Sequence, residues 1–282
     1  MRIFGSVLLL CTLAGALPAE TPLSEPQQKF AAELATTFQN LEKKNAAAGA
    51  GTDGWLFFSG ELRLLSLGRF WGSEAAKVSR AHKPELADPV PAILDFQQQL
   101  KGRGIDLVLV PVPPKAAIYP EKIVPGFDVR ATDPAPMLQR FYDELRAAGV
   151  DVLDLSSLFI ENREHLRGPV FCRTDSHWSG IGCMLAAQAI AEKIRAKLSR
   201  PAVLKEYSPE WKEVQISGDL DGLVSRDTHK PGPEKIVVQR VTEKGNGGAI
   251  LRKGECQYRA METGAWLLLG PCWARRWRCC RR

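Results

Sequence analysis

The chain has 282 residues, of which 45% are hydrophobic and 25% charged, with 24 Gly and 19 Pro. These values are typical of globular domains and exclude a disordered, collagen-like or coiled-coil chain. The formal charge is +6, but five of the 38 basic residues lie in the last eight positions, and the 33 others face 32 acidic residues. A broad basic surface that would bind nucleic acid is therefore not expected. The five terminal basic residues are Arg275, Arg276, Arg278, Arg281 and Arg282.

The first residues have the pattern of a secretory signal peptide. Arg2 precedes an apolar run from Ile3 to Ala16, and small residues stand at the end of the run (Ala14, Gly15 and Ala16) and again at Ala19. The run is shorter than the ~20 residues that a permanent membrane-spanning helix needs. We expect residues 1–19 to be removed on export and the mature protein to be periplasmic. A buried N-terminal helix is the alternative.

The first half of the chain predicts helices around one buried strand. Apolar residues at helical spacing predict an amphipathic helix over residues 25–44. Turn residues followed by an aromatic run predict a strand or hairpin over 49–65. A helix is expected at 91–103, and the Val-rich run at 105–112 suits a strand buried on both faces. A Pro-rich loop follows at 111–126.

The second half repeats the alternation. Helices are predicted at 136–148, 156–164 and 180–198, with a strand at 150–155. Strand–helix–strand order favours an α/β fold with a parallel sheet covered by helices. The remaining predicted strands are a short one at 169–172, an alternating one at 234–241 and an apolar one at 265–269.

Seven cysteines are present, and Cys11 lies in the predicted signal peptide. An oxidising compartment permits disulfides, and Cys172 with Cys183 is the candidate pair in the body of the chain. Unpaired thiols are the alternative. The other cysteines are Cys256, Cys272, Cys279 and Cys280.

The residue types of acid–base chemistry concentrate in the segment TDSHWSGIG at 174–182. In a tight loop entering a helix, the carboxylate of Asp175 can hold the imidazole Nδ1–H of His177 and leave Nε2 as a base for a serine or sugar hydroxyl. A helix-capping Asp beside a surface His is one alternative. A metal site with Cys172 is another, but no second cluster of metal-ligand spacing accompanies it. We expect neither metal nor cofactor.

Four segments in order resemble one known family. They are GTDGWLFF (51–58), VPVPPKAAIYPEKI (110–123), TDSHWSGIG (174–182) and SGDLDGLV (217–224). Together they resemble the SGNH-hydrolase-like acetyltransferase domain of the alginate O-acetyltransferase AlgJ/AlgX family. The resemblance implies one such domain over residues 20–270, with a parallel sheet flanked by helices.

The resemblance also implies roles for particular residues. Asp175 and His177 correspond to the orienting acid and the base of a catalytic triad. Lys115 and Tyr119 lie in the Pro-Lys loop after a strand, where α/β sheets place their sites, and with Trp178 they are candidates for substrate binding. An exposed Lys115 and a packed Tyr119 are the alternative.

The expected nucleophile departs from the family pattern. The resemblance calls for a Gly-x-Ser turn after a late apolar strand, with a backbone N–H in the oxyanion hole. Here AWLLLG at 265–270 is followed by Pro271 and Cys272. Cys272 is a candidate acyl-accepting nucleophile. Residues 271–282 otherwise resemble an out-of-frame reading, so we expect a truncated or frameshifted member with a fold incomplete at this end.

The implied function is an exported O-acetyltransferase acting on hydroxyls of an alginate-type exopolysaccharide. It would use a Ser-His-Asp acyl-enzyme mechanism, whose Ser is missing here, and an acyl donor delivered by a membrane-bound acyltransferase. A carbohydrate esterase is one alternative. The other is a non-catalytic polysaccharide-binding or assembly component. Trp55, Trp71 and Trp178 could stack on sugars, with burial in the core as the alternative.

Overall fold

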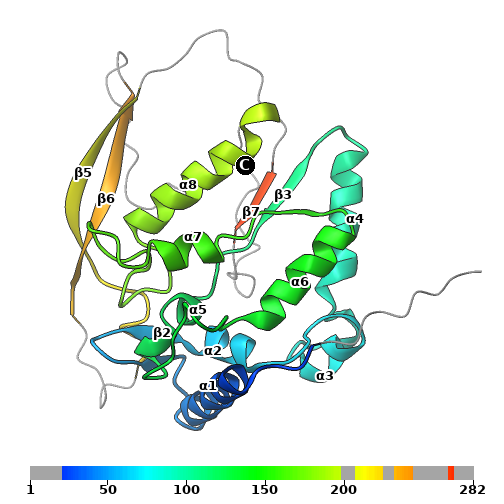
Figure 1. Ribbon diagram of the computed structural model, residues 1–282, viewed down its shortest axis with the longest axis horizontal. Coiled ribbons are helices and arrows are strands. Elements are labelled where there is room, and N and C mark those ends of the chain that lie inside the picture. The colour runs from blue at the N-terminus through cyan, green and yellow to red at the C-terminus, as the bar shows by residue number, and fades with distance from the viewer. Residues whose placement is uncertain (1–20, 198–206, 225–231, 244–265, 270–282) are drawn as a thin grey trace, which may run out of the picture.

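The computed structural model describes residues 21–197, 207–224 and 232–243, and the backbone of 266–269. A small parallel sheet lies at its centre in the order β4-β3-β7. The strands are β3 (Leu107–Val110), β4 (Asp151–Val152) and β7 (Trp266–Leu269). Helices lie on either side of this sheet (Figure 1). The predicted α/β class with a parallel sheet flanked by helices is confirmed.

Two helices that cover the sheet begin and end where the sequence signals it. In α4 (Pro89–Lys101), the side chain of Asp88 accepts a hydrogen bond from the Val90 backbone N–H at 3.1 Å, and proline occupies the first turn. In α6 (Pro136–Ala147), proline again starts the helix. Gly149, at φ +85°, follows it in a conformation that favours glycine. The predicted boundaries of both helices are confirmed to within two residues.

The N-terminal part is partly different from the prediction. Helix α1 (Glu25–Lys43) forms as expected, and β1 (Ala48–Ala50) pairs antiparallel with β2 (Leu56–Phe58). The predicted strand or hairpin over 49–65 is wrong beyond residue 58, where α2 (Ser59–Ser66) begins. A carboxylate oxygen of Glu61 accepts the Phe58 N–H at 3.1 Å and caps this helix.

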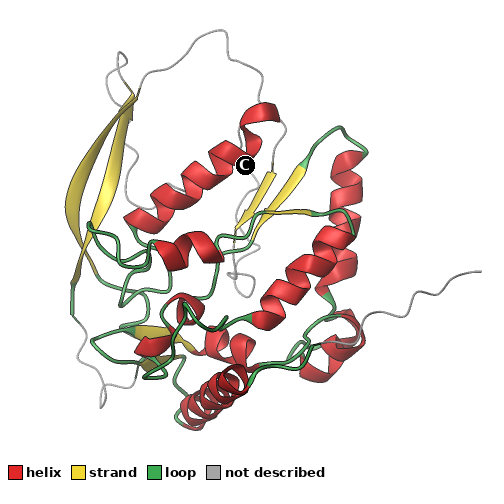
Figure 2. Cartoon of the chain, in the orientation of Figure 1, coloured by secondary structure: helices red, strands yellow, loops and turns green. Residues whose placement is uncertain are grey.

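In the second half of the chain, the strands differ from the prediction in two places (Figure 2). The strand predicted at 169–172 is reduced to a single bridge between Phe171 and Trp178. The strand predicted at 234–241 is confirmed as β6 (Glu234–Glu243), and its partner β5 (Tyr207–Ile216) was not predicted. The charged sequence of β5, with Pro209, lacks an apolar strand pattern. Two further helices are α7 (Ser156–Glu161) and α8 (Gly180–Ile194).

The remaining short elements lie in the connections between the longer ones. They are η1 (Gly72–Glu74), α3 (Ala75–Val78), η2 (Pro84–Leu86), α5 (Lys115–Ile118), η3 (Pro120–Lys122) and η4 (Arg195–Lys197). Among these, α5 follows β3 directly and brings its first residue to the site described below. None of the described helices has the length and hydropathy needed to cross a bilayer.

Two tryptophans considered for sugar stacking belong to the core. Trp55 is 5% exposed and Trp71 is 1% exposed. The Trp71 ring packs against Phe141, and its Nε1–H donates to a Glu144 carboxylate oxygen at 2.7 Å. Sugar stacking by Trp55 or Trp71 is therefore wrong, because a polysaccharide cannot reach the rings.

Candidate active site

A loop of residues 172–179 enters helix α8 and carries the candidate catalytic pair. The Ser179 hydroxyl accepts the N–H of Ile181 at 3.1 Å and so caps α8. The glycines that follow permit close packing. A Cβ on Gly180 would lie 2.3 Å from the Val237 carbonyl oxygen, and a Cβ on Gly182 would lie 2.4 Å from the Val170 carbonyl oxygen. The sequence SGIG thus fixes where the loop ends and where α8 begins.

Asp175 and His177 contact each other within this loop. The Asp175 Oδ1 atom lies 2.8 Å from the His177 Nδ1 atom and also accepts the His177 backbone N–H at 2.9 Å. The turn made by that backbone bond allows two side chains only two residues apart to converge. The imidazole Nε2 makes no hydrogen bond with any residue that the structure describes, and the His177 side chain is 62% exposed.

The contact between Asp175 and His177 favours the charged form of both side chains. Burial acts to raise the pKa of Asp175, but hydrogen bonds from the His177 ring and from the backbone of His177 and Asp219 outweigh it and lower that pKa to about 2. The hydrogen bond with Asp175 in turn raises the pKa of His177 above its ordinary value of 6.5. With Nδ1 engaged by a carboxylate, the open Nε2 is suited to accept a proton.

A second carboxylate, Asp219, completes the immediate surroundings. Its two oxygens accept the Ser176 N–H and the Ser176 hydroxyl, both at 2.6 Å. Its own N–H donates to Asp175 Oδ2 at 3.1 Å. No role was predicted for Asp219 from the sequence, although it lies in the segment SGDLDGLV at 217–224. The close approach requires glycine before it, because a Cβ on Gly218 would lie 1.9 Å from the Thr174 carbonyl oxygen.

The metal-binding alternative is not supported by these contacts. Donor atoms of Asp175, His177 and Asp219 lie within 4.8 Å of one another, which is the spacing of a cation site. All four carboxylate oxygens, however, already accept hydrogen bonds within the two loops. The ligand considered with them, Cys172, is buried, and burial raises the pKa of its thiol to about 12. A buried, protonated thiol is a poor metal ligand.

The predicted substrate contacts Lys115 and Tyr119 are both buried. Lys115 is 1% exposed, so the alternative of an exposed lysine is wrong. The Tyr119 hydroxyl donates to the Arg163 carbonyl oxygen at 2.8 Å and accepts the Val170 N–H at 3.0 Å. The structure places neither side chain where a substrate could touch it, and it favours packing and positioning for both.

The remaining residues singled out from the sequence are Trp178 and the cysteines. Trp178 is half-buried and packs edge-on against Phe159, which favours the core over sugar stacking. Both Cys172 and Cys183 lie in described parts of the chain, and no disulfide joins them. Cys272, together with residues 1–19 and the rest of 271–282, lies outside the described residues.

Glu234, at the start of β6, supports the loop although no local sequence pattern identifies it. It is 6% exposed, and its carboxylate accepts the Arg173 N–H at 2.8 Å. The other oxygen accepts the N–H and the hydroxyl of Thr174, both at 2.9 Å. A buried carboxylate on the two-stranded sheet therefore fixes the backbone immediately before Asp175.

The parallel sheet directs its carboxyl edge toward the same loop. Strand β7 ends at Leu269, which pairs with Val110 at the end of β3. The chain leaving β3 reaches Lys115, whose Nζ lies 2.8 Å from the Asp175 carbonyl oxygen. Strand β7 thus ends at the same edge of the sheet as β3, from which the chain leads to Lys115 and its contact with Asp175.

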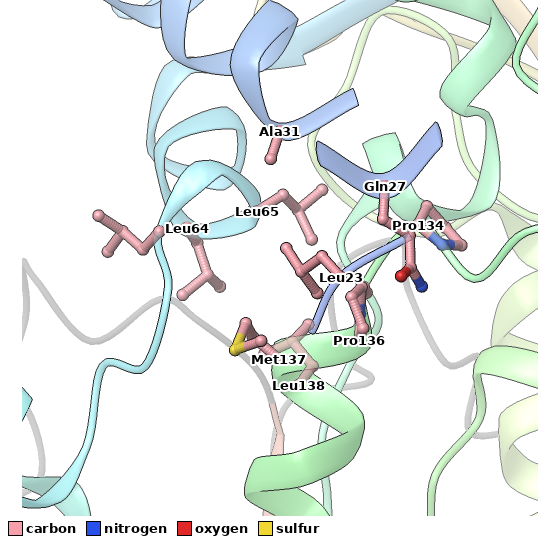
Figure 3. Close-up of a pocket in the computed structure, with 11 residues that line it drawn as sticks. Leu23, Gln27, Ala31, Leu64, Leu65, Pro134, Pro136, Met137 and Leu138 are labelled. Atoms are coloured by element: carbon pink, nitrogen blue, oxygen red, sulfur yellow. The ribbon is translucent and has the colours of Figure 1, made fainter. Parts of the chain in front are cut away.

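An apolar pocket between α1, α2 and α6 lies apart from this site. Figure 3 shows side chains such as Leu23, Leu65 and Met137 around it. None of the residues that line it is titratable. It therefore offers no acid–base chemistry.

Comparisons with known proteins bear on this site. A family profile described as an SGNH hydrolase-like domain of the acetyltransferase AlgX matches residues 49–254. The probable alginate O-acetylase AlgJ of Pseudomonas aeruginosa is 34% identical over 198 residues, which is 68% of this chain and 46% of that protein. The probable alginate O-acetylase AlgJ of Pseudomonas syringae pv. tomato is 30% identical over 178 residues, 63% of this chain and 41% of that protein. The chain therefore spans less than half the length of these curated relatives.

A solved structure agrees with the fold. The O-acetyltransferase domain of Pseudomonas putida AlgJ superimposes with a TM-score of 0.53 at 25% identity, covering 71% of this chain and 66% of that chain. The profile match includes β2 to β6 and the whole 172–179 loop, well over half of the chain. The chain therefore belongs to the AlgJ/AlgX family of SGNH-hydrolase-like acetyltransferase domains.

Proposed function

We propose that the chain is an exported O-acetyltransferase that transfers acetyl groups to hydroxyls of an alginate-type polysaccharide, with Asp175 and His177 as its orienting acid and base. The observation that carries the proposal is the 2.8 Å contact between Asp175 Oδ1 and His177 Nδ1, which leaves Nε2 open at an exposed position. The curated relatives named as probable alginate O-acetylases support the choice of reaction and substrate.

The transfer needs two proton movements through His177. In the first half, a nucleophile gives its proton to Nε2 and attacks the acetyl carbonyl, and the donor alcohol leaves with that proton. In the second half, Nε2 takes the proton of a sugar hydroxyl as its oxygen attacks the acyl-enzyme, and the nucleophile leaves protonated. Asp175 stabilises the imidazolium formed in each half. Positioned acid–base transfer of this kind contributes about 10²–10⁴ in rate.

The nucleophile is assigned to the segment after β7. That strand ends at the carboxyl edge of the sheet, beside the start of the segment that leads to Lys115. Cys272 stands in the sequence where the family pattern has serine, and it would form a thioester instead of an ester. The proposal therefore includes Cys272 as the acyl-accepting residue.

Export and partners complete the proposal. The N-terminal pattern Arg2 to Ala19 supports delivery to the periplasm. A membrane-bound acyltransferase would supply the acetyl donor on the periplasmic side, and the polysaccharide would be the acceptor.

The proposal is tested with a chromogenic acetyl ester as donor and short polyuronate chains as acceptor. Acetylated acceptor is detected by mass spectrometry for the wild type, Cys272→Ala and Cys272→Ser. We expect transfer by the wild type, loss in Cys272→Ala, and transfer in Cys272→Ser, which restores the hydroxyl of the family pattern. Equal transfer by Cys272→Ala and the wild type would refute the assigned nucleophile.

The same experiment separates the alternative functions. Release of acetate without acetylated acceptor would identify an esterase, because water then replaces the sugar hydroxyl. Binding of polyuronate by all three proteins without release or transfer of acetate would identify a non-catalytic binding component. Either result would contradict the proposed transferase activity.

A further inference from the structure

Lys115 is the most completely buried charged side chain near the site. Its Nζ donates to the carbonyl oxygens of Cys172 at 3.1 Å, Arg173 at 3.2 Å and Asp175 at 2.8 Å. Three acceptors require three N–H donors, and only the protonated ammonium has three. The geometry therefore describes a cation that holds three backbone carbonyls of the 172–179 loop.

The surroundings of Lys115 compensate for this burial. The rings of Trp55 and Phe57 lie 5.8 Å and 5.4 Å from Nζ, within cation–π range. Burial lowers the pKa of Lys115, while attraction to the carboxylate of Glu61 opposes that decrease. Glu61 is itself fixed by α5, since it accepts the Ala116 N–H at 3.3 Å.

The loop is thus held by buried charges of opposite sign. Lys115 binds its carbonyl oxygens, and the carboxylate of Glu234 binds the N–H groups of Arg173 and Thr174. A backbone N–H or carbonyl group that is buried without a partner destabilises the fold, so these two side chains determine the path of the loop.

We propose that Lys115 is a positioning residue: by holding the carbonyl oxygens of residues 172, 173 and 175, it places the Asp175 carboxylate against His177 Nδ1. Lys115 does not touch substrate, because it is buried. The inference rests on the proposed function for its catalytic consequence, but the geometric claim stands on the hydrogen bonds alone.

Two roles of Lys115 predict opposite changes at His177. If Lys115 acted only as a nearby positive charge, its removal would raise the pKa of His177, because the charge repels the imidazolium. If Lys115 positions Asp175, its removal weakens the contact that raises the pKa of His177, and that pKa falls toward its ordinary value. The sign of the change therefore distinguishes positioning from simple charge.

The test is an NMR titration of the His177 imidazole in the wild type and Lys115→Met. We expect the pKa of His177 to fall in Lys115→Met toward its ordinary value, because the contact with the Asp175 carboxylate is weakened. Asp175→Asn is the reference for complete loss of that contact. Lys77→Met is the matched control, because the Lys77 side chain is 68% exposed and forms an ion pair with the nearby Glu74. No change in the pKa of His177 is expected there.

A second pair of variants keeps the test decisive. If Lys115→Met fails to fold because Glu61 is left unpaired, the double variant Lys115→Met/Glu61→Gln removes both charges. Lys115→Arg keeps the charge but not the point-like ammonium, so a fall in the pKa of His177 there reports geometry alone. An unchanged or increased pKa of His177 in the folded variants would overturn the proposal.

The outcome is independent of turnover. A decreased pKa of His177 without acetyl transfer by any form of the protein would uphold the positioning role and contradict the proposed function. Acetyl transfer with an unchanged pKa of His177 in the folded variants would uphold the proposed function and contradict the positioning role of Lys115. Where transfer is measurable, we expect Lys115→Met to lower kcat while leaving KM near the wild-type value.

Discussion

Glu234 allows the support of the 172–179 loop to be tested through stability. Its carboxylate accepts three hydrogen bonds from Arg173 and Thr174 while only 6% exposed. In Glu234→Gln the amide oxygen can retain the bonds from Thr174, but the amide NH₂ then faces the Arg173 N–H. A donor faces a donor, and the Arg173 backbone N–H loses its acceptor.

The magnitude follows from the number and type of the bonds changed. A hydrogen bond to a charged group contributes about 1.5–3 kcal/mol, and the two retained bonds become weaker neutral ones. We therefore expect Glu234→Gln to lower the free energy of unfolding by about 3 kcal/mol. For a domain of this size, that corresponds to a decrease in Tm of roughly 6–12 °C.

Thermal unfolding followed by circular dichroism measures the effect. The matched control is Glu210→Gln on β5, because the Glu210 side chain is 64% exposed and forms a surface ion pair with Lys212 at 3.3 Å. Exposed pairs of this kind contribute little, so its Tm should stay close to that of the wild type. Equal Tm values for Glu234→Gln, Glu210→Gln and the wild type would refute the assignment of Glu234 as a buried support of the loop.

Three further predictions concern the same region. Gly218→Ala should destabilise the protein, because its Cβ would lie 1.9 Å from a backbone oxygen, whereas Gly222→Ala, with no atom within 4 Å, should be tolerated in urea unfolding. Burial raises the pKa of the Cys172 thiol to about 12, so peptide mapping after iodoacetamide at pH 8 should find it unmodified in the folded protein and modified in urea. The raised pKa of His177 should make acetyl transfer fall as the pH decreases through that pKa, because the base must be neutral; Asp175→Asn should shift this limb to lower pH and lower its plateau. An unshifted limb would contradict the pairing.

Local signals were sufficient for much of the fold. The helical periodicity of α1, the proline starts of α4 and α6, and the Val-rich run of β3 gave boundaries close to those observed. These features depend on neighbouring residues, which the sequence shows directly. Strand β5 and helix α2 were missed or misassigned, because their patterns are decided by partners distant in the sequence.

The candidate site was predictable only in part. The short separation of Asp175 and His177, before a glycine-rich helix start, was enough to expect their contact. Lys115 lies 60 residues before Asp175 in the sequence, and Glu234 lies 59 residues after it. Both support the contact, but no local pattern identifies residues so far apart as neighbours. Substrate binding and an exposed side chain were the two roles considered for Lys115, whereas its three carbonyl acceptors explain why it is buried.

The measurement that tests the central claim most directly is acetyl transfer by His177→Ala, with and without added imidazole. It is made in the background, wild type or Cys272→Ser, that transfers faster, with the exposed His82→Ala as control. The account predicts a decrease of about 10²–10⁴ in His177→Ala, partial recovery with imidazole because the site is open to solvent, and no change in His82→Ala. Transfer by His177→Ala at the rate of the His82→Ala control would contradict it.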